Sequence, residues 1–219
     1  MADRSKAEIA EKTAPRATKP RVDVPARRAS YLRTAAKVIL AKGASATMQD
    51  IADAAGAPKP VFYRIFPSKH ALIEAMFDHV SDVLTEVQKG QWSGYGWLLR
   101  VLYLEARKEP EIFLVALKTF RGDPVFEPKR QKLLDQVQTK SLAFFVPAPD
   151  ARPGAKQRAT YATKTLNMLS FDTLVTWLEG ADRLSDEARF KWWGRIIREW
   201  RKATREAFEL DGPGASTPD

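Results

Sequence analysis

Apolar residues recur along this chain with the spacing of helices. From about residue 25 onward they fall three and four positions apart, and no stretch alternates apolar and polar residues over a sustained length. One long helix is expected to bury a stripe made of Leu72, Met76, Phe77, Val80, Val83, Leu84 and Val87. The pattern predicts an all-α protein.

Glycine, proline and serine positions predict where these helices begin and end. Gly43 is expected to end the first helix, Gly56 to form a turn between two short helices, and Ser68 to cap the long helix that follows. Residues 147–154 have the composition of a loop. The expected helices cover residues 25–43, 47–55, 60–66, 68–87, 94–108, 110–122, 128–146, 155–179 and 185–210.

The charge of the chain is concentrated in its first third. The 219 residues include 36 Lys and Arg against 27 Asp and Glu, a net charge of +9 with His neutral. Residues 1–70 hold 14 of the basic and 6 of the acidic residues, and the remainder holds 22 and 21. This bias predicts an N-terminal part that binds a polyanion, with a basic tail that serves only solubility as the alternative.

Composition also excludes several classes of protein. The chain has no Cys, so a disulfide scaffold and a cysteine nucleophile are excluded. His70 and His79 have no apparent third partner, so no metal site is expected. We find no glycine-rich phosphate loop or nucleophile elbow, so we expect neither an enzyme nor a cofactor. No apolar run reaches the about 18 residues of a membrane span, and we expect a cytoplasmic protein.

Four segments are expected. Residues 1–24 form a basic extension with too few large apolar groups to join a core, and we expect them to be disordered. This extension is either inert or an arm that follows a DNA minor groove. Residues 25–70 form a first, basic helical domain, residues 71–210 a larger helical domain of nearly neutral charge, and residues 211–219 a flexible tail.

The segment from residue 47 to residue 66, TMQDIADAAGAPKPVFYRIF, carries the most informative pattern. Thr47 and Asp50 have the spacing of a capping box, which places the start of the first short helix. Ala52 is small where two helices cross, and Gly56 can adopt the positive φ of a tight turn. This is the spacing of a DNA-binding helix-turn-helix.

The second short helix has an exposed face suited to DNA. Pro60 fixes a helical φ and Lys59 before it disfavours helix, so the helix begins near residues 59 and 60. Lys59, Val61, Tyr63 and Arg64 are then free to reach base edges and phosphates. Tyr63 has a core position as its alternative, although its rotation away from Phe62 and Phe66 favours exposure.

Residues 27–76, and above all TMQDIADAAGAPKPVFYRIFPSKHAL, resemble the N-terminal domain of TetR-type transcriptional regulators. The resemblance implies a homodimeric repressor that binds a palindromic operator. Residues 25–70 would be its helix-turn-helix DNA-binding domain, with three helices, and residues 71–210 its domain for dimerisation and for binding a small effector. Thr47, Tyr63 and Lys69 would then contact phosphates, and Pro58 departs from the small hydroxyl residue that the family often has. The full set of candidate DNA-binding residues is Thr47, Gln49, Pro58, Lys59, Pro60, Val61, Tyr63, Arg64, Lys69 and His70.

The last two long helices are expected to form the dimer interface, as in the family. The final helix carries a wide apolar stripe of Phe190, Trp193, Ile196, Ile197, Trp200, Ala203, Thr204, Ala207 and Phe208, with Trp192 off it. The effector is expected to be hydrophobic, because aromatic residues are frequent on the middle helices. The candidate ligand-binding residues are Trp97, Tyr103, Phe113, Leu117, Phe120, Phe144, Tyr161, Asn167 and Phe171, and each has a core position as its alternative.

A second class of function fits the same charge pattern. A basic helical protein that binds DNA without regard to sequence, as architectural proteins do, would have the same excess of Lys and Arg. The two hypotheses differ in whether a palindromic site is preferred.

Overall fold

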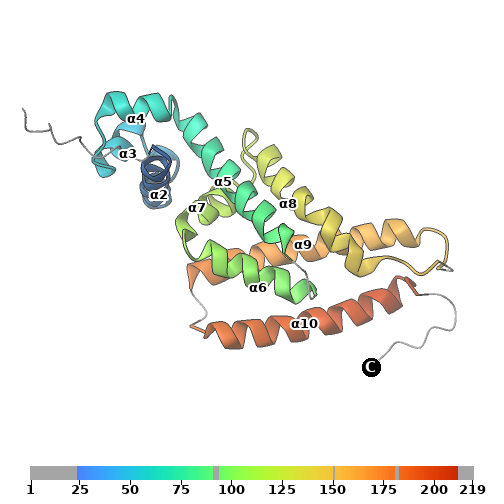
Figure 1. The fold of residues 1–219 in the computed structure, drawn as a ribbon. Helices are drawn as coiled ribbons and strands as arrows, with labels where there is room; N and C mark the ends of the chain where they lie inside the picture. The colour runs from blue at the N-terminus through green and yellow to red at the C-terminus, as the bar shows by residue number, and fades with distance from the viewer. Residues whose placement is uncertain (1–23, 91–93, 150, 181–182, 212–219) are drawn as a thin grey trace, which may run out of the picture.

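The computed structural model describes residues 24–90, 94–149, 151–180 and 183–211, and every regular element in these ranges is a helix (Figure 1). The prediction of an all-α protein is confirmed. The α-helices are α2 (Val24–Lys42), α3 (Met48–Ala54), α4 (Lys59–Ile65), α5 (Lys69–Lys89), α6 (Tyr95–Ala106), α7 (Pro110–Leu114), α8 (Glu127–Leu142), α9 (Ala155–Glu179) and α10 (Asp186–Ala207).

The predicted helix boundaries hold to within a few residues for most elements. The helix expected over residues 110–122 instead consists of α7 and a π-helical segment, Val115–Thr119, and the one expected over residues 128–146 ends in a 3-10 turn, Ala143–Phe145. Val115, Ala116 and Leu117 are all buried because this segment packs against α2, α5 and α9 at once. A segment that is buried on several sides shows no periodic spacing of apolar residues. Its π-helical form therefore could not be predicted from the sequence pattern.

The predicted terminal segments lie mostly outside the described residues. Of the extension expected to be disordered, only Val24 is described, and it is the first residue of α2. Of the tail expected over residues 211–219, only Asp211 is described. Its carboxylate accepts a hydrogen bond of 3.0 Å from Arg205 Nε, which ties this residue to α10.

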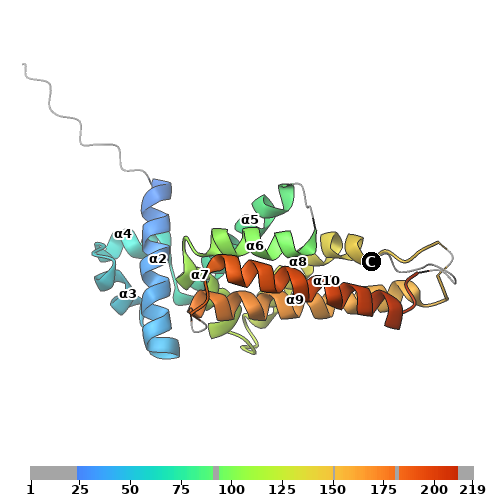
Figure 2. The ribbon, with the colours of Figure 1, turned by 90° about the horizontal axis from the view of Figure 1, so that it is seen from below.

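The helices form a small unit and an elongated body. Helices α2, α3 and α4 gather at one end, and α5 runs from this unit into the body (Figure 1). Helices α6, α9 and α10 lie side by side along the length of the body, where α6 packs against both others (Figure 2). None of the described helices is long and apolar enough to cross a membrane.

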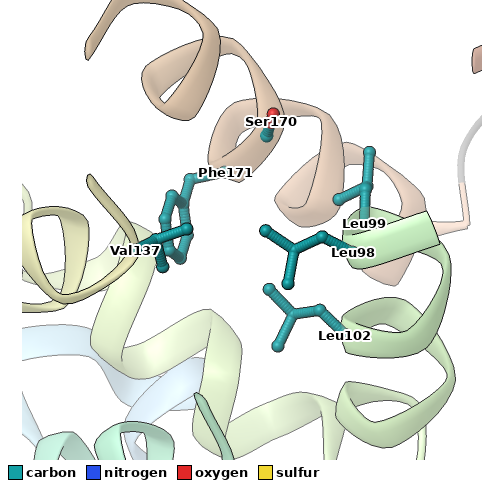
Figure 3. A pocket seen from close by; sticks show the side chains of 6 residues that line it. All are labelled: Leu98, Leu99, Leu102, Val137, Ser170 and Phe171. Atoms are coloured by element: carbon teal, nitrogen blue, oxygen red, sulfur yellow. The ribbon is translucent and has the colours of Figure 1, made fainter. Parts of the chain in front are cut away.

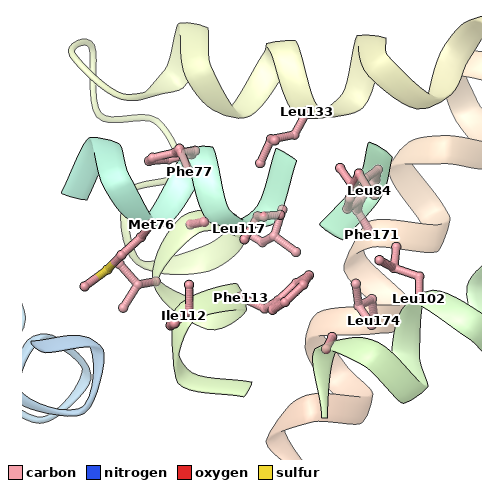
Figure 4. Packing of buried hydrophobic residues seen from close by; sticks show 14 of the residues in the cluster. Met76, Phe77, Leu84, Leu102, Ile112, Phe113, Leu117, Leu133, Phe171 and Leu174 are labelled. Atoms are coloured by element: carbon pink, nitrogen blue, oxygen red, sulfur yellow. The ribbon is translucent and has the colours of Figure 1, made fainter. Parts of the chain in front are cut away.

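A continuous apolar core joins the small unit to the body. Met76 and Leu84 of α5 and Phe113 of α7 are buried in one cluster, where α7 packs against both α2 and α5 (Figure 4). Phe171 and Leu174 extend the same core from α9 (Figure 4). Because α5 contributes buried residues along its length, the small unit and the body are connected by packed side chains rather than by a linker alone.

Charged side chains also tie the small unit to the body. Glu109, which precedes α7, accepts 2.6 Å contacts from Arg33 of α2 and from His79 of α5. Near the start of α8, Lys129 lies 2.8 Å from Glu74 of α5. These contacts attach α2 and α5 to the residue before α7, and α5 also to the start of α8.

Candidate nucleic-acid interface

The start of α3 is fixed by a capping box, as predicted. The Thr47 hydroxyl accepts a hydrogen bond of 3.1 Å from the backbone N–H of Asp50, and the Asp50 carboxylate accepts one of 2.9 Å from the N–H of Thr47. Lys42 at the end of α2 donates to the same carboxylate at 2.7 Å. The hydrogen bonds from Lys42 and then Thr47 hold the pKa of Asp50 well below its ordinary value. The carboxylate of Asp50 therefore links the end of α2 to the start of α3.

The turn between α3 and α4 has the geometry that the sequence predicted. Gly56 adopts a φ of +57°, and the N–H of Ala57 donates to the carbonyl of Ala52 at 3.1 Å. Ala52 has no exposed surface, so its small side chain permits the close crossing of the helices. The ring of Phe62 packs against Tyr31 of α2 with the centroids 5.6 Å apart. These contacts hold α4 firmly on its buried side.

The opposite side of α4 is exposed and basic. The helix begins at Lys59, and Pro58 before it has an extended backbone with φ of −56° and ψ of 124°. Lys59, Tyr63 and Arg64 are exposed, whereas Phe62 is fully buried. Tyr63 is 39% exposed, so its ring does not occupy the core position that was the alternative.

The other predicted DNA-binding residues lie around this face or have partners elsewhere. Thr47, Pro58 and Pro60 are exposed, Val61 and Gln49 are half-buried, and Gln49 donates to Asp53 at 2.6 Å.

Lys69 and His70, at the start of α5, are both engaged within the protein. Lys69 Nζ donates to the carbonyl of Ala44 at 2.7 Å, which holds α5 against the connection between α2 and α3. His70 stacks on Phe126 of the body with the ring centroids 5.2 Å apart and lies 3.4 Å from Glu74. The structure therefore groups Lys69 with the helix-turn-helix unit and His70 with the junction to the body.

One cation beside α4 was not among the predicted site residues. The guanidinium of Arg28, in the first turns of α2, lies over the ring of Phe66 at 5.4 Å from its centroid. Because Phe66 directly follows α4, this contact places an exposed positive charge at the C-terminal end of that helix. Only the basic composition of residues 24–70, eight Lys and Arg against two Asp, indicated such a residue from the sequence.

The predicted ligand-binding residues do not gather around one pocket. Phe171 alone of the set lines a small apolar cavity, of about 10 Å³, between α6, α8 and α9, together with Leu98, Leu99, Leu102, Val137 and Ser170 (Figure 3). Tyr103 lines a different, more open cleft of about 460 Å³.

The remaining seven predicted ligand-binding residues lie elsewhere. Phe113, Leu117 and Phe120 are buried in the core, and Trp97 and Phe144 are half-buried. Asn167 is buried and accepts a hydrogen bond of 2.9 Å from Ser141. Tyr161 is 66% exposed and so lies on the surface of α9. Helix periodicity places these residues on the middle helices, but it does not determine which side of each helix encloses a space.

Comparison with known proteins agrees with this arrangement. Residues 32–76 match the family model of bacterial regulatory proteins of the tetR family. This match spans α2 from its ninth residue, α3, α4 and the first turns of α5. A search of curated proteins gives no match.

Several solved structures share the fold. The fatty acid degradation regulator FadR from Bacillus halodurans aligns with a TM-score of 0.60 at 14% identity, over 78% of this chain and 94% of that one. GusR from Salmonella enterica aligns with a TM-score of 0.57 at 17% identity, over 87% and 99%. A tetR-family transcriptional regulator from Streptomyces coelicolor aligns with a TM-score of 0.56 at 17% identity, over 84% and 82%. The predicted resemblance of the N-terminal part to the tetR family and the predicted two-part helical fold are confirmed.

Proposed function

We propose that this chain, a TetR-family DNA-binding transcriptional regulator, acts as a homodimeric repressor on a palindromic operator and is controlled by a small-molecule effector. The observation that carries the proposal is the exposed surface of α4, which presents Lys59, Tyr63 and Arg64 while Phe62 is buried. A short helix that is packed on one side and basic on the other is the form of a recognition helix that enters the major groove.

The residues around α4 divide by the part of DNA that each can reach. Lys59 and Arg64 have charged donors suited to the acceptors on guanine edges, so we assign them to base recognition. Tyr63 and Thr47 have hydroxyl groups suited to phosphate oxygens, which fix the position of the helix on the duplex. Arg28 adds a positive charge beside the same helix and joins the phosphate contacts.

Dimerisation through α9 and α10 is supported by exposed apolar side chains on both helices. Met168 and Leu169 of α9 are 45% and 42% exposed, and Trp192 and Ile196 of α10 are 50% and 38% exposed. Large apolar groups that gather on one surface mark an interface between proteins. Most of the apolar stripe predicted on α10 is used within the subunit, since Trp193 is only 1% exposed. The proposed contact thus combines Ile196 of this stripe with Trp192, which the stripe left out.

The apolar cavity between α6, α8 and α9 is the proposed starting point for a hydrophobic effector. Its walls are almost wholly aliphatic or aromatic, and Ser170 adds one hydroxyl (Figure 3). Its free volume of about 10 Å³ is close to what a single water molecule needs, so an effector requires that these helices move apart. Such a movement would change the position of α5, which packs against α6 and α8 and continues to the small unit of α2, α3 and α4.

Selection of bound fragments from a random DNA pool at near-physiological salt tests the proposal. We expect enrichment of a palindrome whose half-sites lie about one helical turn of DNA, or a multiple of it, apart. Two copies of the chain per palindrome, measured by sedimentation of the complex, are expected for a single dimer. Salt-sensitive binding without enrichment would contradict the proposal and favour the architectural alternative.

A further inference from the structure

The cleft that contains Tyr103 is separate from the apolar cavity and has a different chemistry. It has a volume of about 460 Å³, within the range of small-molecule sites. It lies where the end of α6, the start of α7, the end of α9 and the start of α10 meet. Its lining consists of Tyr103, Arg107, Pro110, Trp177, Leu178, Gly180, Leu184, Ser185, Asp186 and Arg189.

Two arginines and one aspartate give the cleft an excess of one positive charge. Arg189 is buried, at 6% exposure, and donates to the Tyr103 hydroxyl at 2.8 Å and to Asp186 at 3.1 Å. Arg107 also donates to Asp186, through its Nη1 atom. Both guanidinium groups lie over the Tyr103 ring at 5.6 Å from its centroid. Both guanidinium groups therefore bind one carboxylate, that of Asp186, and can bind an anion of the same kind.

Arg107 is the member of this group that a ligand can reach. Its side chain is 49% exposed, whereas that of Arg189 is 8% exposed. Its hydrogen bond to Asp186 uses one of the three nitrogens of the guanidinium. Tyr103 stays uncharged beside it, because burial raises the pKa of its hydroxyl. The two arginines repel a cationic ligand, so the charge of the cleft favours anions.

The other wall of the cleft is apolar. Trp177 is buried at its base with its ring centroid 5.4 Å from that of Tyr103. Leu184, which precedes α10, is 48% exposed and lines the cleft with its apolar side chain. Pro110 and Leu178 complete this side. A ligand that satisfies both walls has a flat apolar part and one negative charge.

We propose that this cleft binds a planar aromatic carboxylate, with its charge on Arg107 and its ring along Leu184 and Leu178. The position of the cleft gives such binding a consequence for DNA, which rests on the function proposed above. Pro110 is the first residue of α7, and Glu109 before it contacts Arg33 of α2 and His79 of α5. A ligand against Pro110 therefore acts one residue away from the ion pairs that hold the DNA-binding unit on the body.

Calorimetric titration of the full chain, without DNA, tests the site. The probe is 2-naphthoate, with the neutral isostere 2-naphthamide and with acetate, which has no ring, as comparison ligands. We expect saturable binding of 2-naphthoate and at least about tenfold weaker binding of either comparison ligand, because each lacks one of the two recognised features.

Two variants and a matched control locate the binding. Arg107→Gln is expected to weaken 2-naphthoate binding about tenfold, and Leu184→Ala to weaken it less. Arg121→Gln is the control, because Arg121 is 51% exposed and lies 3.0 Å from Asp172, an arginine–aspartate pair much like that of Arg107 but away from the cleft. The control is expected to bind as the unmodified chain does. The absence of binding, equal binding of 2-naphthamide, or an equal loss in both arginine variants would overturn the proposed site.

The consequence for DNA is measured separately. Saturation with 2-naphthoate is expected to change the Kd for the selected operator by at least about fivefold, a typical coupling between two sites. The Glu109→Gln variant is expected to reduce this change while leaving 2-naphthoate binding intact. An unchanged Kd for the operator would overturn the coupling. Failure to select any operator would instead count against the proposed function, since the calorimetry uses no DNA.

Discussion

Individual side chains on α4 make different contributions to DNA binding in the proposed complex. Arg64 is exposed and is assigned to a base edge, so the Arg64→Ala variant is expected to lose about 1–3 kcal/mol on the operator and much less on random DNA. Titration of labelled operator and of labelled random duplex, followed by fluorescence anisotropy, measures both losses.

The control for this substitution is Arg152→Ala. Arg152 is also exposed and pairs with Glu209 at 2.6 Å, but it lies in the loop before α9, in the body. We expect it to bind both duplexes as the unmodified chain does. Equal losses of Arg64→Ala on operator and random DNA would show that Arg64 contacts phosphates rather than bases.

The sequence predicted the exposure of Tyr63 on α4 but not the contacts of Lys69 and His70, and the difference has a physical reason. Exposure of Tyr63 followed from its rotation relative to Phe62 and Phe66 on one short helix, which is local information. The contact of Lys69 with Ala44 and the stacking of His70 on Phe126 join residues 25 and 56 positions apart. Contacts of that kind depend on how helices pack, and a helical pattern does not contain them.

Among the elements, α3 is joined to α2 through a charged side chain, Asp50, which lies in its first turn. The pKa of Asp50 is depressed in the folded chain, chiefly by Lys42 and then by Thr47, so the carboxylate stabilises the fold above its unfolded pKa. This stabilisation is lost as the pH falls through the ordinary range of Asp titration and below it. We therefore expect the Asp50→Asn variant to show a smaller decrease in melting temperature than the unmodified chain between about pH 5 and pH 2.

Thermal unfolding followed by circular dichroism at several pH values checks this expectation. The Lys42→Met variant provides an independent comparison, because it removes the hydrogen bond that lowers the pKa most. It too is expected to flatten the dependence on pH. A decrease of the same size in all three proteins would show that Asp50 contributes nothing to acid stability.

The ends of the helices were more predictable from the sequence than the environment of each side chain on them. The capping box at Thr47, the turn at Gly56 and the cap at Ser68 are local signals, and each is present where it was expected. The residues that line cavities were not predictable in this way. Tyr161 and Phe171 lie on the same helix and have similar rings, yet one is 66% exposed and the other lines a cavity.

At the scale of the whole molecule, the central expectation is a dimer through α9 and α10. Trp192 is half exposed, so the Trp192→Glu variant is expected to keep the fold of the subunit and to place two like charges in the interface. Sedimentation velocity is expected to show a shift from dimer to monomer at micromolar concentration. Operator affinity is expected to fall by at least about tenfold, because one half-site is then bound at a time.

Leu104→Glu is the matched control for the dimer. Leu104 is 40% exposed on α6, so the substitution also adds a charge at an exposed apolar position of a helix. This variant is expected to remain a dimer. If Trp192→Glu also remained a dimer with unchanged operator affinity, the proposed interface would be contradicted.

Sequence-specific DNA binding by the unmodified chain is the claim on which the rest depends. The most direct measurement is the ratio of the Kd for a shuffled duplex to the Kd for the selected palindrome, at near-physiological salt. The account predicts a ratio of at least about 10³, which is typical of specific regulators. A ratio near one would contradict it, because the basic face of α4 would then bind DNA through phosphates alone.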